Sequence, residues 1–386
     1  MKIQNKKYFC YEIYKNLAIW SHNGQLGFNP CSFFKGYIKK SDNFDFKEVW
    51  NSPERQQLKR CVETDTAIPG CQSCYNNEAA GLPSRRQSSK KLYEEYFCNT
   101  DIDLDGPSGL DYSVGNLCNL KCVVCGPHNS SAWISDYQQL YPEVSVELFK
   151  YKKFEQLEIT DTELLKNIQS LHFHGGGEPL LSKNHINLLQ AIKEVKGLSD
   201  VRIFYNINGT VRVDDHILEL WSQCQLIELY FSIDDIEDRF DYQRTGAHWK
   251  QVVENLEWYK ENMPHNHMFN VNAVWSHLNL YYLDELVDWY QNSFNQNRYG
   301  DPTNLIFQTA IDRGQTGLQV KSLPSKTKEI LIDKFKNYPK LLELVQSVPV
   351  NNNTNYSNFW NYINNLDRIK NTSFEKLCPE WSNLLK

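Results

Sequence analysis

Three cysteines within eight residues are the part of this sequence best suited to chemistry. Cys118, Cys122 and Cys125 form a CxxxCxxC pattern on what the sequence predicts to be a tight loop. Three thiolates at this spacing can ligate three irons of a [4Fe–4S] cluster, whereas electron-transfer ferredoxins prefer four. The fourth iron then has no protein ligand and can chelate the amino and carboxylate groups of S-adenosylmethionine. One electron passed to the sulfonium would release a 5′-deoxyadenosyl radical. The alternative is three unrelated buried thiols.

A glycine run follows the cysteine triplet along the chain, in Gly175-Gly176-Gly177-Glu178-Pro179. Without Cβ atoms, glycines let the backbone approach a ligand closely and leave its amides and carbonyls free to bind it. Glu178 can accept a hydrogen bond from a positively charged ligand amine. A tight turn between a strand and a helix would explain the glycines alone. Their place after the cysteine loop favours cofactor binding.

The elements that must position these groups alternate between strand and helix from about residue 109. The sequence predicts strands at 110–114, 171–174, 201–207, 227–233, 269–274 and 305–308, with helices at 185–195, 214–224, 248–262 and 280–290. Repeated strand–helix units indicate an α/β fold with a parallel sheet, here a partial (β/α)6 TIM-like barrel. Functional groups are then expected at the carboxyl ends of the strands.

The parts outside the barrel have a different composition. Residues 1–100 hold most of the remaining cysteines and are predicted to form a small iron–sulfur module. A short helix is expected within 44–58, capped by Asn51 or Ser52 with Pro53 at its first position. The segment 101–108 reads as a linker, 109–320 as the barrel, and 321–386 as a helical C-terminal extension.

Bulk properties exclude several classes of function. The net charge is −6, and the sequence lacks the basic footprint of a nucleic-acid-binding protein. No apolar run reaches the length of about 18 residues that a membrane span needs. The first residues lack the apolar stretch of a signal peptide, so a cytoplasmic location is expected. In that compartment the 11 cysteines read as metal ligands or catalytic thiols and not as disulfides.

The triplet, the glycine segment and the strand–helix repeats together resemble the radical S-adenosylmethionine superfamily. The resemblance implies an oxidoreductase-like enzyme with S-adenosylmethionine bound at the open cluster. It also implies cofactor-binding roles for Gly176, Gly177, Glu178, Asn208, Ser232, Asp234 and Arg244. A helix-cap role for Arg244 and plain strand-end turns at Ser232 and Asp234 are the alternatives. Val124 departs from the family, which usually has an aromatic residue there near the adenine. That contact would have to come from elsewhere, for example from Trp133.

The N-terminal cysteines resemble a second, narrower pattern. Cys10, Cys31 and the pair Cys71 and Cys74 are similar to the twitch variant of the SPASM module, placed here ahead of the barrel. The resemblance implies that these four residues ligate one auxiliary [4Fe–4S] cluster, which would make two clusters in all. The CxxC pair alone would suit zinc equally well. Cys61 lies close enough in sequence to replace one ligand.

Candidates for direct catalysis are less specific. Cys98, Cys224 and Cys378 are the free thiols that can donate a hydrogen atom to a substrate radical, although small buried hydrophobes are the alternative. His172 and His174 alternate along a predicted strand and therefore share one face. They are candidates for acid–base or substrate contacts, and the alternative is a pair of satisfied strand histidines.

The sequence thus predicts an enzyme that forms a 5′-deoxyadenosyl radical and removes a hydrogen atom from its substrate. The auxiliary cluster would serve as an electron relay, and an external reductant of the flavodoxin or ferredoxin type would supply electrons. A small sugar or nucleotide-linked substrate is favoured because no peptide-recognition winged helix is apparent; a peptide or protein substrate is the alternative. A non-catalytic iron–sulfur or zinc scaffold is the second alternative. No membrane partner is expected, and a nucleic-acid partner is not favoured.

Overall fold

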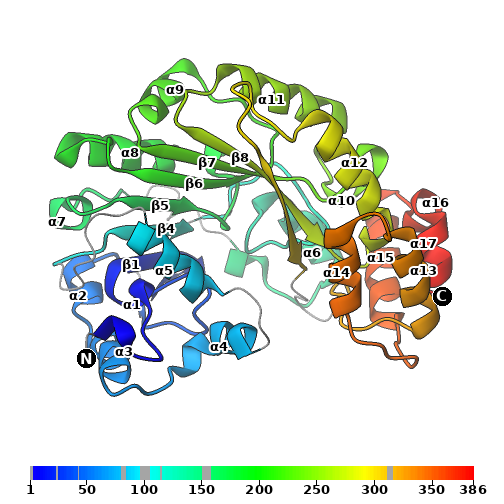
Figure 1. The fold of residues 1–386 in the computed structure, drawn as a ribbon, viewed down its shortest axis with the longest axis horizontal. Helices are drawn as coiled ribbons and strands as arrows, with labels where there is room; N and C mark the ends of the chain where they lie inside the picture. Colours follow the sequence, from blue (N-terminus) through cyan, green and yellow to red (C-terminus); the bar gives the residue numbers. More distant parts are fainter. Residues whose placement is uncertain are drawn as a thin grey trace.

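One sheet organises the computed structural model of the chain (Figure 1). The structure describes residues 3–22, 25–41, 43–79, 84–95, 105–113, 115–149, 158–310 and 316–386. Among them, strands pair in the order β3-β2-β1-β4-β5-β6-β7-β8-β9. Every pair from β1–β4 to β8–β9 is parallel, whereas β1–β2 and β2–β3 are antiparallel. The mostly parallel sheet confirms the predicted α/β fold.

The six predicted strands all form, and helices cover one face of them (Figure 1). The strands are β4 (Gly109–Ser113), β5 (Ser170–Phe173), β6 (Arg202–Ile207), β7 (Leu226–Ser232), β8 (His267–Trp275) and β9 (Asn304–Thr309). The covering helices are α8 (Lys183–Lys196), α9 (Asp215–Ser222), α11 (Trp249–Asn262) and α12 (Leu283–Ser293). Side-chain caps fix where the first two begin, because Ser182 accepts from Asn184 N and Asp214 accepts from Ile217 N.

The strands present their two faces to different surroundings. Phe173 stacks on Tyr205 at 4.9 Å and meets His185 of α8, so these aromatic residues lie on the helix-covered face. Successive side chains of a strand point to opposite faces. His172 therefore faces the other way, toward the inner side of the sheet, and so do its register partners Asp111 and Phe204.

Three N-terminal strands extend this sheet beyond the barrel strands. They are β1 (Asn16–His22), β2 (Gln25–Asn29) and β3 (Lys39–Ser41), and β1 runs parallel to β4 with Ala18 opposite Asp111. The sequence did not predict them, since the segment mixes short apolar runs with turn residues. One sheet thus runs through both 1–100 and 109–320, and the three-part division of the chain stays a prediction.

The helices of the N-terminal segment are α1 (Tyr11–Lys15), α2 (Phe46–Trp50), α3 (Pro53–Glu63), α4 (Gln72–Ala79) and α5 (Arg85–Glu95). The segment has a small core of its own between α1, α3 and α5, whereas the buried residues of α2 belong to the main core. The buried members of the small core include Phe9, Tyr14, Val62 and Tyr93, with the half-buried Cys61 packed against them. The predicted cap is confirmed, because the Ser52 side chain accepts from Arg55 N and Pro53 is the first residue of α3.

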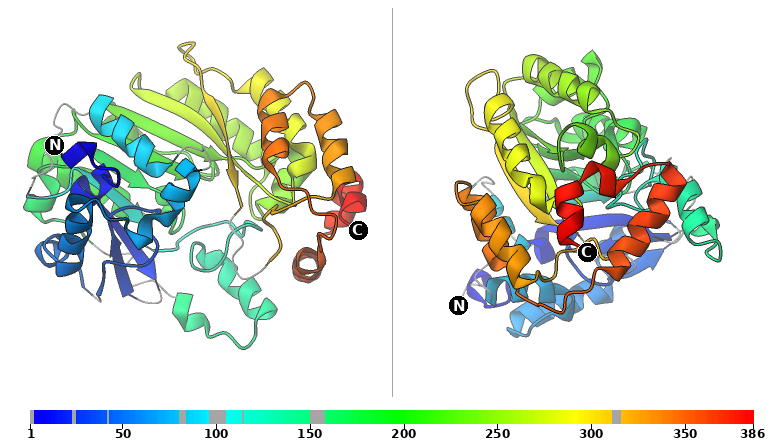
Figure 2. Two further views of the ribbon diagram at one scale, coloured as in Figure 1. Left: turned by 60° about the horizontal axis from the view of Figure 1, so that its bottom comes forward. Right: turned by 90° about the vertical axis from the view of Figure 1, so that its right-hand side faces the viewer.

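The C-terminal extension is helical, as predicted, and packs beside α10 and α12 (Figures 1 and 2). Trp381 attaches this extension to the segment after β8, because its Nε1 donates to His277 O at 2.8 Å. Figure 2 shows the α6 segment lying between the N-terminal elements and these helices. Among the described helices, none is long and apolar enough to cross a membrane. The remaining helices are α6 (Ile134–Leu140), α7 (Thr162–Leu165), α10 (Glu237–Gln243), α13 (Ser325–Lys334), α14 (Pro339–Ser347), α15 (Ser357–Lys370), α16 (Phe374–Leu377) and α17 (Pro379–Leu384).

Candidate functional site

The cysteine loop follows β4 and is held by hydrogen bonds from distant parts of the chain. Lys121 N donates to Thr245 O at 2.8 Å, just beyond α10. From another side, Trp133 Nε1 donates to Cys122 O at 2.8 Å. Residues 115–130 contain no helix or strand, so these outside contacts take the place of regular structure. They fix the loop at the carboxyl end of β4, where functional groups were expected.

The thiols of the loop lie close enough to influence one another's protonation. Burial raises the pKa of Cys118 to about 11, and Glu178 and Cys125 add to the rise. Burial also raises the pKa of Cys122 to about 12; the Arg244 guanidinium opposes this rise, while Cys125 and Cys118 add to it. Thiolates, not thiols, bind metals, so metal binding must displace these protons. Three converging thiols form a donor set that fits an iron–sulfur cluster.

Gly176 and Gly177 pack directly against the segment that leads into the cysteine loop. Their φ angles are +73° and +104°, values that residues with side chains rarely adopt. A Cβ on Gly176 would lie 2.8 Å from Gly115 O, and one on Gly177 would lie 2.5 Å from Leu117 O. Only glycine permits this approach. The close contact that the sequence predicts is therefore made with the chain's own loop, and contact with a cofactor stays a prediction.

Glu178 joins the glycine turn to the end of β6. Its Oε2 accepts from Asn208 N at 2.8 Å, and its Oε1 accepts from Leu180 N at 3.4 Å. Burial raises the pKa of Glu178 to about 7, while those two hydrogen bonds and Arg244 act in the opposite direction. Both carboxylate oxygens are thus engaged by the backbone, although each keeps a second lone pair. The predicted bond to a ligand amine stays a prediction.

Asn208 ties the end of β6 to the cysteine loop. Its Nδ2 donates to Asn119 Oδ1 at 2.9 Å and lies 4.0 Å from Cys118 Sγ. Its Oδ1 accepts from the Thr210 hydroxyl at 2.7 Å, and that hydroxyl also accepts from Asn119 Nδ2 at 2.9 Å. These contacts position Cys118. The sequence did not single out Asn119, although its place directly after Cys118 is the signal that could have found it.

Asp234 and Arg244 form a buried ion pair beside the loop. Arg244 Nη2 lies 2.8 Å from Asp234 Oδ2, and Arg244 Nη1 lies 3.9 Å from Cys122 Sγ. Asp234 Oδ1 also accepts from Val274 N at 2.8 Å, which links β7 to β8. A guanidinium so placed favours the thiolate form of Cys122. Ser232 is the last residue of β7, so it lies at the same end of that strand as Asp234. Ligand contacts of Ser232, Asp234 and Arg244 stay predictions.

The candidate hydrogen-donating thiols lie away from the cysteine loop where the structure describes them. Cys224 comes just before β7, at the opposite end of that strand from Ser232, and its thiol contacts Leu220 O at 3.5 Å. Cys378 is buried at the start of α17 in the C-terminal extension. Cys98 lies outside the described residues. A hydrogen-donating role for any of them stays a prediction.

His172 and His174 lie near a buried carboxylate that the sequence did not single out. Burial, followed by the charge of Arg85, lowers the pKa of His172 to about 3. Burial alone would raise the pKa of Asp111, but His174, Arg85 and His172 hold it well below its usual range. At neutral pH, His172 is therefore neutral and Asp111 ionised. Asp111 was missed because one acidic residue in a short strand gives no local signal.

The four N-terminal cysteines come from separate elements and lie near one another. Cys10 precedes α1, Cys31 follows β2, Cys71 ends a short 3₁₀ turn and Cys74 lies in α4. Burial and then Glu12 raise the pKa of Cys10 well above its usual value, and Cys71 and Cys74 add to the rise. The same causes, with Cys10 adding, raise the pKa of Cys31. The set fits the predicted auxiliary cluster, which stays a prediction.

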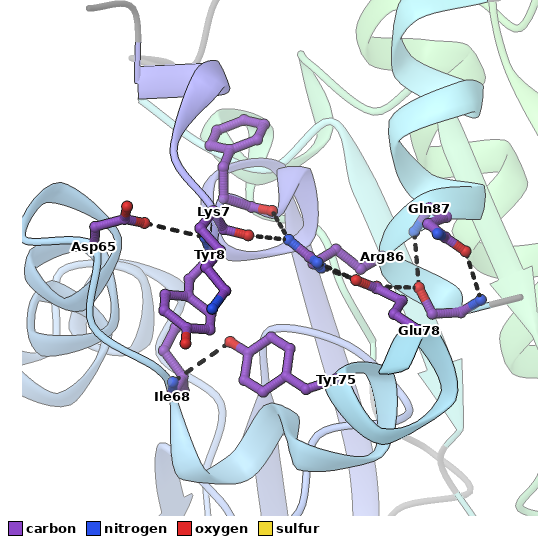
Figure 3. Close-up of polar contacts among 10 residues, drawn as sticks. Lys7, Tyr8, Asp65, Ile68, Tyr75, Glu78, Arg86 and Gln87 are labelled. Carbon is purple, nitrogen blue, oxygen red and sulfur yellow. Dashed lines mark hydrogen bonds and ion pairs between the residues drawn. The ribbon is translucent and has the colours of Figure 1, made fainter. Parts of the chain in front are cut away.

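Arg86 braces the segment that directly precedes Cys10 (Figure 3). Its Nη1 donates to Lys7 O at 2.5 Å and to Phe9 O at 3.3 Å. The same guanidinium pairs with Glu78, with Nε donating to Glu78 Oε1 at 3.0 Å. Because Glu78 belongs to α4 and Arg86 to α5, this pair connects the helix that carries Cys74 with the segment before α1.

The C-terminal helix α15 also contacts the cysteine loop, which the sequence did not predict. The Tyr362 hydroxyl donates to Val123 O at 3.1 Å, and Lys370 Nζ donates to Lys121 O at 3.0 Å. Burial lowers the pKa of Lys370 to about 8, and its Nζ lies 4.7 Å over the Trp133 ring. Trp133 is buried and supports the loop, and an adenine contact for it stays a prediction.

Comparisons with known families and curated proteins found matches to part of this chain. The model of the Radical SAM superfamily matches residues 112–289. A GTP 3′,8-cyclase of Limosilactobacillus fermentum is 29% identical over 117 residues, which cover 30% of this chain and 30% of that protein. A GTP 3′,8-cyclase of Mannheimia succiniciproducens is 26% identical over 156 residues, covering 38% of this chain and 40% of that protein. The chain thus matches less than half the length of these relatives.

Solved structures with similar topology include two that cover more of the chain. Native anSMEcpe with bound AdoMet and Cp18Cys peptide is 16% identical with a TM-score of 0.39, covering 64% of this chain and 63% of that one. Streptococcus suis SuiB is 12% identical with a TM-score of 0.36, covering 87% of this chain and 70% of that one.

Proposed function

We propose that this chain is a radical S-adenosylmethionine enzyme, because the superfamily's model matches residues 112–289, and that it oxidises or rearranges a polar small molecule, such as a sugar or a nucleotide-linked compound. Cys118, Cys122 and Cys125 would hold the superfamily's [4Fe–4S] cluster. Together with S-adenosylmethionine, that cluster supplies a 5′-deoxyadenosyl radical that removes a substrate hydrogen atom.

The chain's own residues have separate tasks around that chemistry. Arg244, paired with Asp234, places a positive charge beside Cys122 and favours its thiolate. Gly176 and Gly177 let the turn after β5 lie against the cysteine loop, which brings backbone amides and carbonyls to the same place. These contacts hold the cysteines and the glycine turn in one arrangement before any cofactor binds, so little reorganisation is required on binding.

The observation that carries the substrate class is the polar inner side of the sheet. Arg202 Nη2 lies 3.1 Å from Glu228 Oε1, and the Tyr230 hydroxyl donates to Glu228 Oε2 at 2.8 Å. Register places Glu228 beside Phe204 and Tyr230 beside Asn270, so these residues share the inner side with His172. Buried charged and amide groups of this density suit a hydrogen-bonding substrate more than an apolar one. The matched curated relatives are named for GTP, a nucleotide, which agrees with this class.

The second part of the proposal concerns the N-terminal cysteines. Cys10, Cys31, Cys71 and Cys74 would hold an auxiliary [4Fe–4S] cluster that accepts one electron from the substrate radical, while one proton leaves to solvent. The chain would then carry out a net oxidation, with an external one-electron reductant of the flavodoxin or ferredoxin type serving the first cluster. The buried setting of Cys10 and Cys31 supports this part, because it shields the thiols from water.

The proposal is tested by anaerobic reconstitution with iron and sulfide, reduction with dithionite, and chromatography for 5′-deoxyadenosine. We expect deoxyadenosine from the native chain and none from a Cys118→Ala control. Candidate nucleotides and sugar nucleotides, and in parallel short peptides, are then added. Faster deoxyadenosine formation with a nucleotide or sugar supports the small-molecule class. Stimulation by peptides alone would replace that class with the peptide alternative, and no deoxyadenosine at all would leave only a binding scaffold.

A further inference from the structure

The inner side of β4 and β5 carries a cluster of metal-ligating atoms that neither cysteine region includes. Asp111 of β4 lies opposite His172 of β5, and His174 is the next residue on the same side. One ligand atom from each of the three residues lies within 4.8 Å of the other two. We propose that Asp111, His172 and His174 bind a divalent transition-metal ion of the Zn²⁺ or Fe²⁺ class.

The distances within this triad suit a shared ion better than direct hydrogen bonds. His172 Nδ1 lies 3.6 Å from Asp111 Oδ1, and His174 Nε2 lies 3.8 Å from Asp111 Oδ2. Both separations exceed the range of an N–H···O hydrogen bond. Ligand atoms at about 2.0–2.2 Å from one tetrahedral ion lie about 3.4 Å apart. A small closure of the triad would therefore complete a metal site.

Asp111 has an unused ligand atom deep inside the protein. Its side chain is 0% exposed, and its Oδ1 accepts no hydrogen bond from any described residue. Its Oδ2 accepts from Ser32 N at 3.0 Å, which fixes the orientation of the carboxylate. A buried carboxylate oxygen without a hydrogen bond is costly and calls for a partner. A cation bound between Asp111 and the two histidines would be that partner.

The balance of charged side chains around the triad favours a bound cation. Arg85 Nε lies 2.8 Å from Glu12 Oε1, and Arg85 Nη2 lies 3.7 Å from Asp111 Oδ1. A single guanidinium thus faces two buried carboxylates, and its close contact is with Glu12. A bound metal ion would supply the missing positive charge.

His172 shares its other ring nitrogen with a neighbouring side chain, as metal-binding histidines usually do. His172 Nε2 lies 2.9 Å from the Ser170 hydroxyl, so an N–H at Nε2 can donate to Ser170. The lone pair of Nδ1 then points toward Asp111. Ligating histidines commonly give their other ring nitrogen to such a partner. Three protein ligands also leave a coordination position open for water or for an oxygen atom of a substrate.

Zinc is the probe for this site, offered to the full chain after both cysteine regions have been reconstituted with iron and sulfide. After dialysis against Zn²⁺ and removal of unbound metal, we expect about one zinc per chain. X-ray absorption at the zinc edge should show nitrogen and oxygen ligands at about 2.0–2.2 Å and no sulfur at about 2.3 Å. This measurement needs no variant, so it holds even where a substitution disturbs folding.

Variants then assign the ligands. Asp111→Asn and His174→Gln should lose stoichiometric zinc, and Ser170→Ala should weaken zinc binding about 10–100-fold. His185→Gln is the control, because His185 is a buried histidine that lies on the helix-covered face. Iron content and thermal unfolding confirm that each variant is folded. Zinc bound through sulfur, zinc retained equally by the triad variants, or no zinc retained by the native chain would overturn the proposal.

Discussion

The two cysteine-bearing regions bring their thiols together in different ways. Cys118, Cys122 and Cys125 belong to one loop, so the chain between them already limits how far apart they can lie. The N-terminal thiols come from four places, of which Cys10 and Cys74 are separated by α1, three strands, α2 and α3. The first region is local in sequence and irregular in structure, whereas the second is distributed and depends on regular elements.

This difference indicates which interactions each region depends on. The cysteine loop has no element of its own, and contacts from Trp133, Thr245 and the glycine turn fix its backbone. The N-terminal thiols are fixed by the small core around Phe9 and Tyr93 and by the Arg86 brace. Changes at the loop should therefore act on one site. Changes in the N-terminal elements should act on folding of that part and on its thiols together.

The largest expected effect is on iron content and deoxyadenosine formation, which should respond differently to changes in the two regions. Cys118→Ala should abolish 5′-deoxyadenosine formation, because the loop would keep only two thiols for the cluster. Iron should fall from about eight to about four per chain, the share of one four-iron cluster. Cys71→Ala should lower iron by a similar amount while leaving deoxyadenosine formation without substrate in place. Iron analysis and anaerobic chromatography measure both quantities.

Two outcomes would contradict the view that the two regions hold separate clusters. Native iron near about four per chain would show that the N-terminal thiols hold no four-iron cluster. Loss of deoxyadenosine in Cys71→Ala, with the loop cluster still visible by electron paramagnetic resonance, would show that the regions do not act separately. Cys224→Ala is the control, since that buried thiol lies at the other end of β7 and should change neither quantity.

The second effect tests how the glycine turn supports the loop. Gly177→Ala would place a Cβ 2.5 Å from Leu117 O at a residue whose φ is +104°. We expect a loss of about 3 kcal/mol or more in the free energy of unfolding, because strain and collision add. Gly197→Ala is the matched control: φ is +84°, but no atom lies within 4 Å of the added Cβ. It should cost about 1–2 kcal/mol.

Chemical denaturation of the cluster-free chain measures both variants. Equal losses in Gly177→Ala and Gly197→Ala would mean that backbone strain alone matters and that contact with the loop does not. A larger loss in Gly177→Ala, together with poorer iron loading, would support the packing contact.

Local patterns in the sequence were enough to predict the six parallel strands and the cysteine loop. Each strand is a short apolar run, and the helices that follow β5 and β6 begin at the side-chain caps Ser182 and Asp214. The Ser52–Pro53 start of α3 was readable for the same reason. Hydrophobic alternation and caps depend on neighbours in sequence, so no knowledge of the tertiary structure is required.

Features that depend on distant contacts could not be predicted in this way. β1 pairs with β4 across more than 90 residues, and nothing near Asn16 or Leu17 announces that partner. Asp111 became notable only when His172 and Arg85 were found beside it. The contact of α15 with the loop spans 239 residues between Tyr362 and Val123. Such pairs are decided by packing, which a single sequence does not display.

The third effect concerns the distributed region. Arg86→Met removes the bonds to Lys7 O and Phe9 O and the pair with Glu78. We expect a loss of about 1–3 kcal/mol in the free energy of unfolding and reduced iron at the N-terminal cysteines. Arg60→Met is the control, since the Arg60 side chain is exposed and, among the described residues, donates to the Gln57 side chain alone. Thermal unfolding and iron analysis are the measurements, and an equal effect of both variants would contradict the bracing role.

The Arg86 pair also predicts a pH dependence. Burial alone would raise the pKa of Glu78, but the Arg86 and Ser84 hydrogen bonds outweigh it and lower this pKa. A carboxyl with a lowered folded-state pKa stabilises the protein above its unfolded pKa of about 4.3, and the gain is lost as pH falls through the folded value. Stability of the native chain should therefore decline more steeply than that of Glu78→Gln as the pH falls below about 4.3.

The smallest expected effect concerns the contact between α15 of the C-terminal extension and the cysteine loop. Tyr362→Phe removes one hydrogen bond, from the Tyr362 hydroxyl to Val123 O at 3.1 Å, and leaves the ring in place. We expect a loss of about 1 kcal/mol in the free energy of unfolding, measured by denaturation. Tyr338→Phe is the control within the same extension, because its hydroxyl bonds to the surface residue Asp288. If the loop depends on outside contacts, Tyr362→Phe should also slow iron loading at Cys118, Cys122 and Cys125, and Tyr338→Phe should not. Identical loading in both variants would mean that α15 only covers the loop, and that Trp133 and the glycine turn are sufficient to hold it.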